Sequence, residues 1–216
     1  MNQFNEIKNW HNEVILKEVK DNLTKRDFNV VILNTINDIA DYMVKTIPAN
    51  ARVGLGGSIT LREIGIDKLL RDRGNTLLDH WEKNLTPEQS LETRKGQLTS
   101  DYFLTSANAV TRDGRIINID GIGNRVAAMI FGPKHVIAVI SANKIAKDLD
   151  DAIYRAKNTA SAMNTKRGNM ETPCAKTGFC ADCRPPKTIC RVTTIIDYRP
   201  MLTDFTVILT PVELGF

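Results

Sequence analysis

TSANAVTRDGRIINIDGIGNRVAAMIFGP, residues 105–133, is the stretch that decides the fold of this chain. Within it, Asp113-Gly114 separates two segments of strand character, 108–111 and 115–119. This dipeptide favours a two-residue hairpin turn, because glycine and aspartate tolerate the positive φ angles that such a turn requires. The stretch therefore predicts two strands joined by a tight turn.

A polar loop with two glycines, DGIGN at 120–124, follows the predicted hairpin. A short apolar helix is expected next, over 125–131, and Gly132-Pro133 would end it. Hairpin, loop and helix start would bring polar side chains and backbone N–H groups to one point, which suits an anionic or polyhydroxylated ligand. The alternative is that these polar side chains only cap turns. The candidate ligand-binding residues of this stretch are Asn108, Asn118, Asp120, Gly121, Gly123 and Asn124.

A second glycine-rich loop, GLGGSIT at 54–60, lies between a predicted strand, 51–55, and a predicted helix, 61–69. Glycines let the backbone turn sharply and approach a ligand, and neighbouring hydroxyls can cap the helix or donate hydrogen bonds. The loop lacks both the GK[ST] of a Walker motif and the GxGxxG spacing of a dinucleotide-binding loop. A plain strand-to-helix turn is the alternative to an anion cradle. The residues expected to form the cradle are Gly56, Gly57, Ser58 and Thr60.

Predicted strands and helices alternate along the whole chain. This alternation predicts an α/β fold, with an open, mostly parallel sheet covered by helices on both faces, as a single domain over 1–216. His80, Trp81 and Lys144 follow strand ends, where the ligand-facing residues of such sheets lie. Lys144 is therefore a candidate anion contact, and a solvated lysine is the alternative. The predicted strands include 28–33, 51–55, 75–79, 101–105, 135–140, 192–197 and 205–209, and the predicted helices 2–26, 35–47, 61–69, 86–99 and 147–162.

All four cysteines lie in one segment, 171–191, with the spacing C-x5-C-x2-C-x6-C. Four thiolates within one loop can close a tetrahedral site, and the central C-x2-C suits metal binding. The spacing matches neither the bacterial ferredoxin motif nor a standard zinc ribbon. We expect an iron–sulfur cluster of the [4Fe–4S] type, with zinc or a set of free thiols as alternatives. The candidate ligands are Cys174, Cys180, Cys183 and Cys190.

Charge and hydropathy restrict the class of partner. The net charge is +4, and lysine and arginine are scattered among acidic residues, so nucleic acid is not indicated. The chain has no secretory h-region and no apolar run long enough to span a membrane, so we expect a cytoplasmic protein. The amphipathic helix predicted over 2–26 either packs on its own domain or forms a homodimer contact.

The segments GGSITLREIG, TSANAVTRDGRIINIDGIGNRVAAMIFGPKHVI, ANKI and NTKR, with the cysteine loop and the final ELGF, resemble the LUD domain family, which includes lactate utilisation protein C. The family is similar in fold to ribose-5-phosphate isomerase, glucosamine-6-phosphate isomerase and the CoA transferases. The resemblance places Asn108 and Asn118 where a related isomerase branch has a functional Asp and Asn. Because asparagine cannot act as a general base, Asp120 is the nearest candidate catalytic carboxylate, with Asn118 beside it.

The resemblance implies a subunit of an iron–sulfur system that oxidises L-lactate to pyruvate, with iron–sulfur partner subunits. An isomerase or CoA-transferase-like enzyme, acting on a sugar phosphate or an acyl-CoA, is the alternative. A ligand sensor on the same fold is the third possibility. All three bind a small organic anion, and whether this chain is itself an enzyme stays open.

Overall fold

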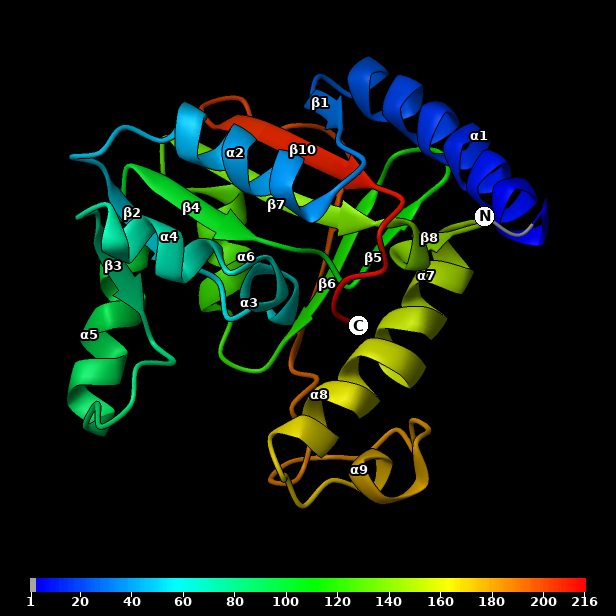
Figure 1. Cartoon of the computed structure of the whole chain (residues 1–216). Helices are drawn as coiled ribbons and strands as arrows, with labels where there is room; N and C mark the ends of the chain where they lie inside the picture. Colours follow the sequence, from blue (N-terminus) through cyan, green and yellow to red (C-terminus); the bar gives the residue numbers. More distant parts are fainter. Residues whose placement is uncertain (1–2) are drawn as a thin grey trace.

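The computed structural model describes residues 3–216, and its centre is a sheet of six parallel strands (Figure 1). The strand order is β1-β10-β7-β4-β2-β3, so strands from both ends of the chain lie side by side. This confirms the α/β class predicted from the sequence. The six strands are β1 (Asn29–Ile32), β10 (Asp204–Thr210), β7 (His135–Ser141), β4 (Tyr102–Thr105), β2 (Arg52–Leu55) and β3 (Thr76–Asp79).

Helices cover both faces of this main sheet. Successive strand residues point to opposite faces, so Ile137 and Val139 pack against α2, α3 and α4, whereas Val136 and Ala138 pack towards α1 and α6. Both faces are therefore closed by apolar side chains, and each strand reads as a continuous hydrophobic run. The covering helices are α1 (Gln3–Lys25), α2 (Ile36–Thr46), α3 (Ile59–Ile64), α4 (Ile66–Asp72), α5 (Pro87–Gln97) and α6 (Asn124–Ile130).

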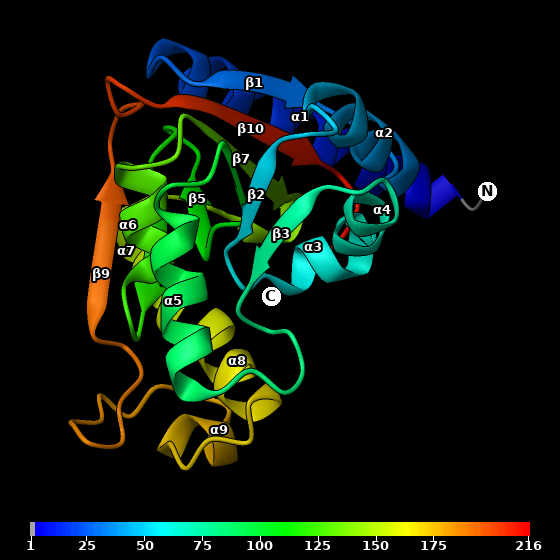
Figure 2. The ribbon, with the colours of Figure 1, turned by 90° about the vertical axis from the view of Figure 1, so that its left-hand side faces the viewer.

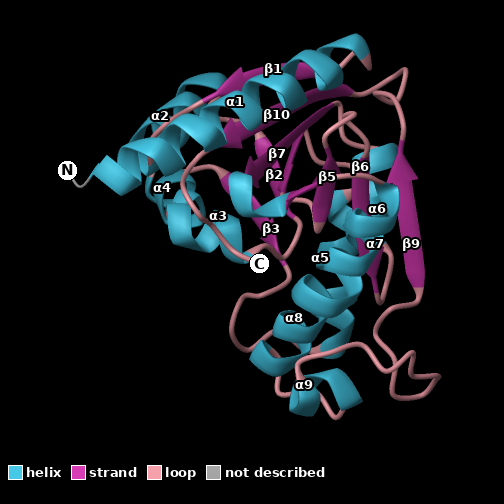
Figure 3. Ribbon diagram, turned by 90° about the vertical axis from the view of Figure 1, so that its right-hand side faces the viewer, coloured by secondary structure: helices cyan, strands magenta, loops and turns pink. Residues whose placement is uncertain are grey.

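A second, smaller sheet lies beside the first, in the order β8-β5-β6-β9 (Figure 3). The sequence predicted the main sheet but not this second one, to which the hairpin strands and one closing strand belong. The hairpin itself is present, with Val110 opposite Ile116, but four residues, 112–115, separate its strands and Gly114 takes the positive φ of 91°. The strands are β5 (Ala109–Thr111), β6 (Ile116–Asp120), β8 (Ile145–Ala146) and β9 (Val192–Ile196).

Two predicted helices are divided in the structure. Gly65, at φ 73°, ends α3 and starts α4. The helix predicted over 147–162 runs longer, as α7 (Leu149–Arg155), a π-helical turn η2 (Ala156–Ser161) and α8 (Ala162–Arg167), which form one column in Figure 1. A short helix, α9 (Pro173–Thr177), follows at its end.

The amphipathic character of α1 is confined to its second half. Leu16, Val19 and Leu23 are fully buried against the main sheet, whereas Ile7 and Trp10 of the predicted apolar stripe are more than half exposed. Residues 1 and 2, the second of which belongs to the predicted helix, lie outside the described residues. No helix in the described part of the chain is long and apolar enough to cross a membrane.

Candidate functional site

The two glycine loops meet at one cleft of about 420 Å³, on the carboxyl edge of the main sheet. The segments that follow β2, β3, β4 and β7 all contribute to it, which is where ligands bind in open α/β sheets. The second sheet and α8 form its other walls. Nine residues predicted from the sequence line this cleft: Gly56, Gly57, Ser58, Thr60, Asn108, Asp120, Gly121, Asn124 and Lys144.

Two predicted residues lie behind the cleft wall. Asn118 is fully buried, accepts a hydrogen bond from the backbone N–H of Asn108 at 3.1 Å, and donates to Met129 Sδ. Gly123 starts α6 in a left-handed conformation, with φ 93°. Neither lines the cleft, so we assign both to the support of the wall and no longer assign Asn118 a catalytic role.

Asp120 lines the cleft, but both of its carboxylate oxygens have partners. Oδ1 accepts from Arg125 Nε at 2.8 Å and Nη2 at 2.5 Å, and Oδ2 accepts from the backbone N–H of Val126 at 3.2 Å. Arg125 also donates to Oδ1 of Asn108 at 3.0 Å. This network fixes the start of α6 against the hairpin, and it occupies the groups that a general base would need free.

The cleft carries an excess of positive charge. Among the lining residues that the structure describes, Asp120 is the carboxylate, and it is already paired with Arg125. The cationic side chains on the cleft are Arg94, Arg125, Lys144, Arg167 and Arg191. Fixed cationic groups beside a concave, partly desolvated site attract anions.

Arg94, which extends from α5, carries an unused donor. Its Nη1 donates to the backbone oxygen of Ser90 at 3.0 Å, but its Nε is buried and has no hydrogen-bond partner among the described residues. Burial lowers the pKa of this guanidinium, which still stays charged at any ordinary pH. A buried N–H donor without a partner is costly.

Lys144 forms the floor of the cleft, at the end of a short 3-10 turn (Ala142–Lys144) after β7. Its side chain is only 2% exposed. Its Nζ donates to Thr60 Oγ1 at 2.7 Å and to Ser106 Oγ at 2.9 Å. Burial, followed by the charges of Arg155 and Arg125, lowers the pKa of Lys144 to about 7.

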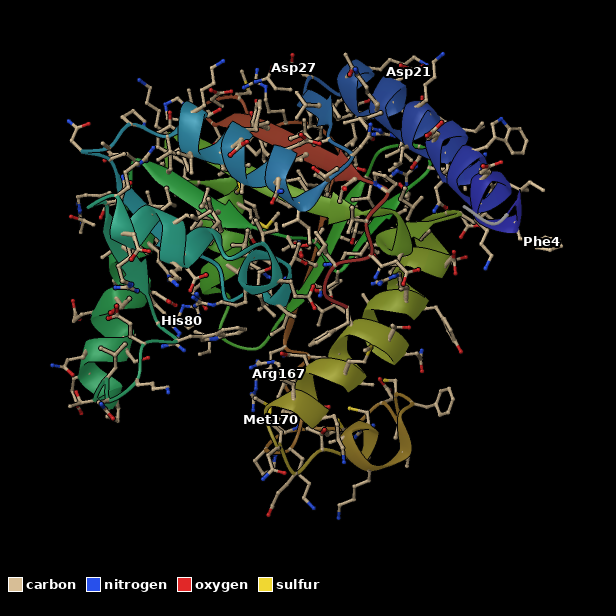
Figure 4. All side chains as sticks on the ribbon, in the orientation of Figure 1. Phe4, Asp21, Asp27, His80, Arg167 and Met170 are labelled. Carbon is tan, nitrogen blue, oxygen red and sulfur yellow. The ribbon has the colours of Figure 1, made fainter. Side chains whose placement is uncertain are left out.

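His80 and Trp81 line the cleft on the connection after β3 (Figure 4). Burial and the charge of Arg94 lower the pKa of His80 to about 4, so the ring is neutral near pH 7. Trp81 contacts α8 across the cleft, because the guanidinium of Arg167 lies 4.3 Å from the centre of its ring. This cation–π contact joins the two sides of the site.

The cysteine segment contributes to a wall of the same cleft, and Figure 2 shows this segment running from α9 to β9. Thr188, Ile189 and Arg191 line the cavity, and the backbone oxygen of Ile189 lies close enough to Gly121 that a Cβ there would meet it at 3.0 Å. The Sγ of Cys190 donates to Ser161 Oγ at 3.4 Å, and Ser161 also lines the cavity. The two features that the sequence showed separately are therefore neighbours.

The four cysteines are free thiols in this structure. Burial raises the pKa of Cys190, and the other three thiols are near enough to raise it further. However, no group of three or more His, Cys, Asp or Glu side chains in residues 3–216 is placed to hold a metal ion. Cys174 instead contacts the hydroxyls of Thr165 and Thr172, at 3.4 and 3.3 Å. The thiols therefore do not fit a metal or cluster in this conformation.

Several cleft residues escaped prediction as ligand contacts. Arg125 was placed within an apolar helix, and Ser106 between two predicted strands, 101–105 and 108–111. Their signal was positional: Arg125 directly follows the predicted site residue Asn124, and Ser106 directly follows the carboxyl end of a predicted strand. Thr188 and Ile189 carried no such signal, because only the fold brings the cysteine segment to the glycine loops. The unpredicted lining residues include Ser106, Ala107, Ile119, Arg125, Ala160, Ser161, Met170, Thr188, Ile189 and Phe216.

A family model described as the LUD domain matches residues 16–210. The chain is also similar in structure to a DUF162 family protein from Deinococcus radiodurans, with 13% sequence identity and a TM-score of 0.52, over 92% of this chain and 97% of that one. At this identity the similarity concerns the fold alone. No curated protein matches the chain.

Proposed function

Because the chain belongs to the LUD domain family, we propose that it binds a small organic anion in the cleft between its glycine loops, as a subunit of a lactate-oxidising system. Oxidation of lactate to pyruvate releases two electrons and two protons. The electrons would pass to iron–sulfur partner subunits, as the sequence resemblance implies. The role assigned to this chain is to hold the 2-hydroxy acid or its 2-oxo product.

The observation that carries this proposal is the charge of the cleft. Four arginines face it, Arg94, Arg125, Arg167 and Arg191, against one carboxylate side chain, Asp120, which is already paired with Arg125. Arg94 is the sharpest instance, because its Nε has no acceptor among the described residues and a small movement of the side chain would let a carboxylate oxygen supply one. The volume of about 420 Å³ falls within the range of small-molecule sites, roughly 300–1,000 Å³.

A sugar phosphate or an acyl-CoA is the second candidate ligand class. The cleft is larger than a three-carbon acid requires, and it offers many hydroxyl and amide groups. The lining groups of this kind are Ser58, Thr60, Ser106, Asn108, Asn124, Ser161, Asn164 and Thr188. The carboxylate that an isomerase would use as its base is engaged, which favours binding of a carboxylic acid over isomerisation.

A ligand panel tests the proposal. We expect L-lactate or pyruvate to raise the melting temperature, because a ligand that binds only the folded state stabilises it by about 2.7 kcal/mol at a hundredfold excess over Kd. Ribose 5-phosphate and acetyl-CoA are measured beside them. Potassium chloride at equal ionic strength is the control for general screening.

The Arg94→Gln variant makes the test specific. Loss of a charge-assisted hydrogen bond, worth about 1.5–3 kcal/mol, should weaken anion binding roughly tenfold or more. Arg71→Gln is the matched control, because Arg71 is exposed and pairs with Glu82 away from the cleft. The proposal is wrong if no anion of the panel binds, or if both variants bind it as the parent does.

A further inference from the structure

Lys144 is a buried amine whose only hydrogen-bond partners in the described part of the chain are two hydroxyls. Its Nζ contacts Thr60 Oγ1, in the first turn of α3, and Ser106 Oγ, directly after β4. A buried ammonium without a carboxylate partner is strongly destabilised, so the neutral amine is favoured at such a position. No step of the proposed function has used this amine.

Both hydroxyls have other acceptors within reach. Thr60 Oγ1 lies 3.4 Å from the backbone oxygen of Leu214 and 3.5 Å from Ser106 Oγ, and Ser106 Oγ lies 3.5 Å from the backbone oxygen of Ala107. When the hydroxyls donate to these backbone oxygens, both hydroxyl oxygens are acceptors for Nζ. A neutral amine has two N–H donors, and these two bonds use both of them. Its lone pair is left without a partner, and Lys144 lines the cleft.

The charges around Lys144 act in the same direction. Arg155 of α7 and Arg125 of α6 both disfavour a further positive charge, and Glu63 of α3 opposes them weakly. Burial is the largest cause, and together these effects bring the pKa of Lys144 to about 7. At pH 7.5 a large share of the molecules would therefore carry the nucleophilic amine, whereas an ordinary lysine near ~10.4 would be almost fully protonated.

We propose that Lys144 is a nucleophile that forms an imine with the carbonyl carbon of a 2-oxo acid bound in the cleft. The amine nitrogen attacks the carbonyl carbon, a C=N double bond replaces the C=O double bond, and the carbonyl oxygen leaves as water with the two protons of the neutral amine. No oxidant or reductant takes part in this step. The inference rests on the proposed function, because it requires the carboxylate of the same ligand to be held by the cleft arginines.

Reductive trapping tests this directly. The protein is incubated with pyruvate and sodium cyanoborohydride at pH 7.5, and the labelled residue is identified by peptide mass spectrometry. Hydride addition to the imine carbon fixes the bond, so the labelled peptide gains the mass of pyruvic acid less one oxygen. We expect saturable labelling at Lys144, at least about tenfold above that at exposed lysines, since their amines stay protonated. L-Lactate, which lacks the carbonyl, should compete with it.

Two variants complete the experiment. Lys144→Arg keeps a cation but has no nucleophilic amine, so the specific label should disappear. Lys147→Arg is the matched control, because Lys147 lies three residues further on and its side chain is 82% exposed. Its labelling pattern should equal that of the parent. The parent protein alone already gives the decisive result, so the test holds even if Lys144→Arg folds poorly.

The outcomes separate the two proposals. If pyruvate and lactate both stabilise the protein but no label reaches Lys144, the imine is wrong and the anion-binding function stands. If neither acid binds and no label forms, both are wrong. Label spread evenly over surface lysines and unchanged by lactate also overturns the imine.

Discussion

The side-chain amide nitrogen of Gln97 lies 2.9 Å from Nδ1 of His80. Gln97 is fully buried, and the same nitrogen lies 2.8 Å from the backbone oxygen of Leu55, at the end of β2, and 2.9 Å from that of Leu78, near the end of β3. Its two N–H groups are therefore shared among three acceptors. Its side-chain oxygen accepts from Asn124 at 3.1 Å. One glutamine therefore joins both glycine loops to the connection that carries His80.

Because His80 is neutral in the folded protein, we expect the free energy of unfolding to fall in mild acid. The pKa of His80 is lowered to about 4, chiefly by burial, whereas an unfolded histidine titrates near ~6.5. Between these values the unfolded chain binds a proton that the folded protein does not, so the free energy of unfolding falls as the pH falls from about 6.5 to 4. Urea unfolding at pH 7 and pH 5 measures the difference.

The His80→Gln variant should show a smaller fall between pH 7 and pH 5 than the parent, because it removes this titration. His11→Gln, on the exposed face of α1, should behave as the parent does. Equal pH dependence in all three proteins would show that His80 is protonated as easily in the folded state as in the unfolded chain.

Replacement of Asp120 by asparagine should reduce stability without abolishing anion binding. The change removes the charge that Arg125 pairs with, in a contact where the two side chains are 9% and 15% exposed, and should cost about 1.5–3 kcal/mol. Anion affinity should hold or rise, because a negative group leaves the cleft. Asp41→Asn, on the exposed face of α2, is the control. Lost turnover at full stability would instead restore Asp120 as the catalytic carboxylate.

Gly57→Ala should weaken ligand binding more than its backbone strain explains. Gly57 has φ 64°, and an added Cβ would lie 3.0 Å from His80 Nε2 and 3.3 Å from Trp81. Gly74→Ala is the matched control, since Gly74 has φ 94° and nothing within 4 Å of its Cβ position. Both variants should lose about 1–2 kcal/mol from the left-handed backbone, but only Gly57→Ala should raise the Kd for the anion. Equal affinities would place Gly57 outside the binding surface.

The spacing of the four cysteines still predicts a metal site. Binding of a metal would require the cysteine segment, 171–191, to rearrange. The thiols of Cys174 and Cys190 would exchange their hydroxyl partners for the metal, since no suitable group of ligands is gathered within the described residues. Protein purified without oxygen should then contain iron and sulfide, or zinc, in a fixed ratio to the chain. Cys183→Ser should lower that content. A well-folded, metal-free and colourless protein would contradict the prediction.

The sequence predicted most of the main sheet because its strands are short apolar runs with clear ends. It also found both glycine loops, since glycine next to serine or aspartate after a strand is a local signal. The sequence predicted strands at β5, β6 and β9 but not their separation into a second sheet, which is a property of the tertiary fold. The fourth strand, β8, has two residues, too few for any periodicity. Gln97 was missed as a structural centre because the sequence of α5, PEQSLETRKGQ, has the composition of a solvated helix.

The division of α1 shows the same limit. The spacing of Phe4, Ile7, Trp10 and Val14 favours an apolar face, yet all four are among the exposed residues, and the buried face starts at Leu16. The spacing of apolar residues indicates that a helix has an apolar face. It does not indicate which part of that face packs against the sheet. The meeting of the cysteine segment with the cleft is likewise a property of the tertiary fold, and no local pattern encodes it.

The π-helical turn lies between α7 and α8, so it sets the direction in which the residues of α8 point towards the cleft. Each residue of an α-helix advances the rotation by about 100°, so one residue more or fewer turns everything beyond it to another direction. The wider π turn takes up one extra residue with little change of direction beyond it, so deleting a single residue within Ala156–Ser161 would restore regular winding and keep Arg167 over Trp81. Related chains with a one-residue gap here should therefore keep the bridge over the cavity, whereas a one-residue gap within α8 before Arg167 should lose it.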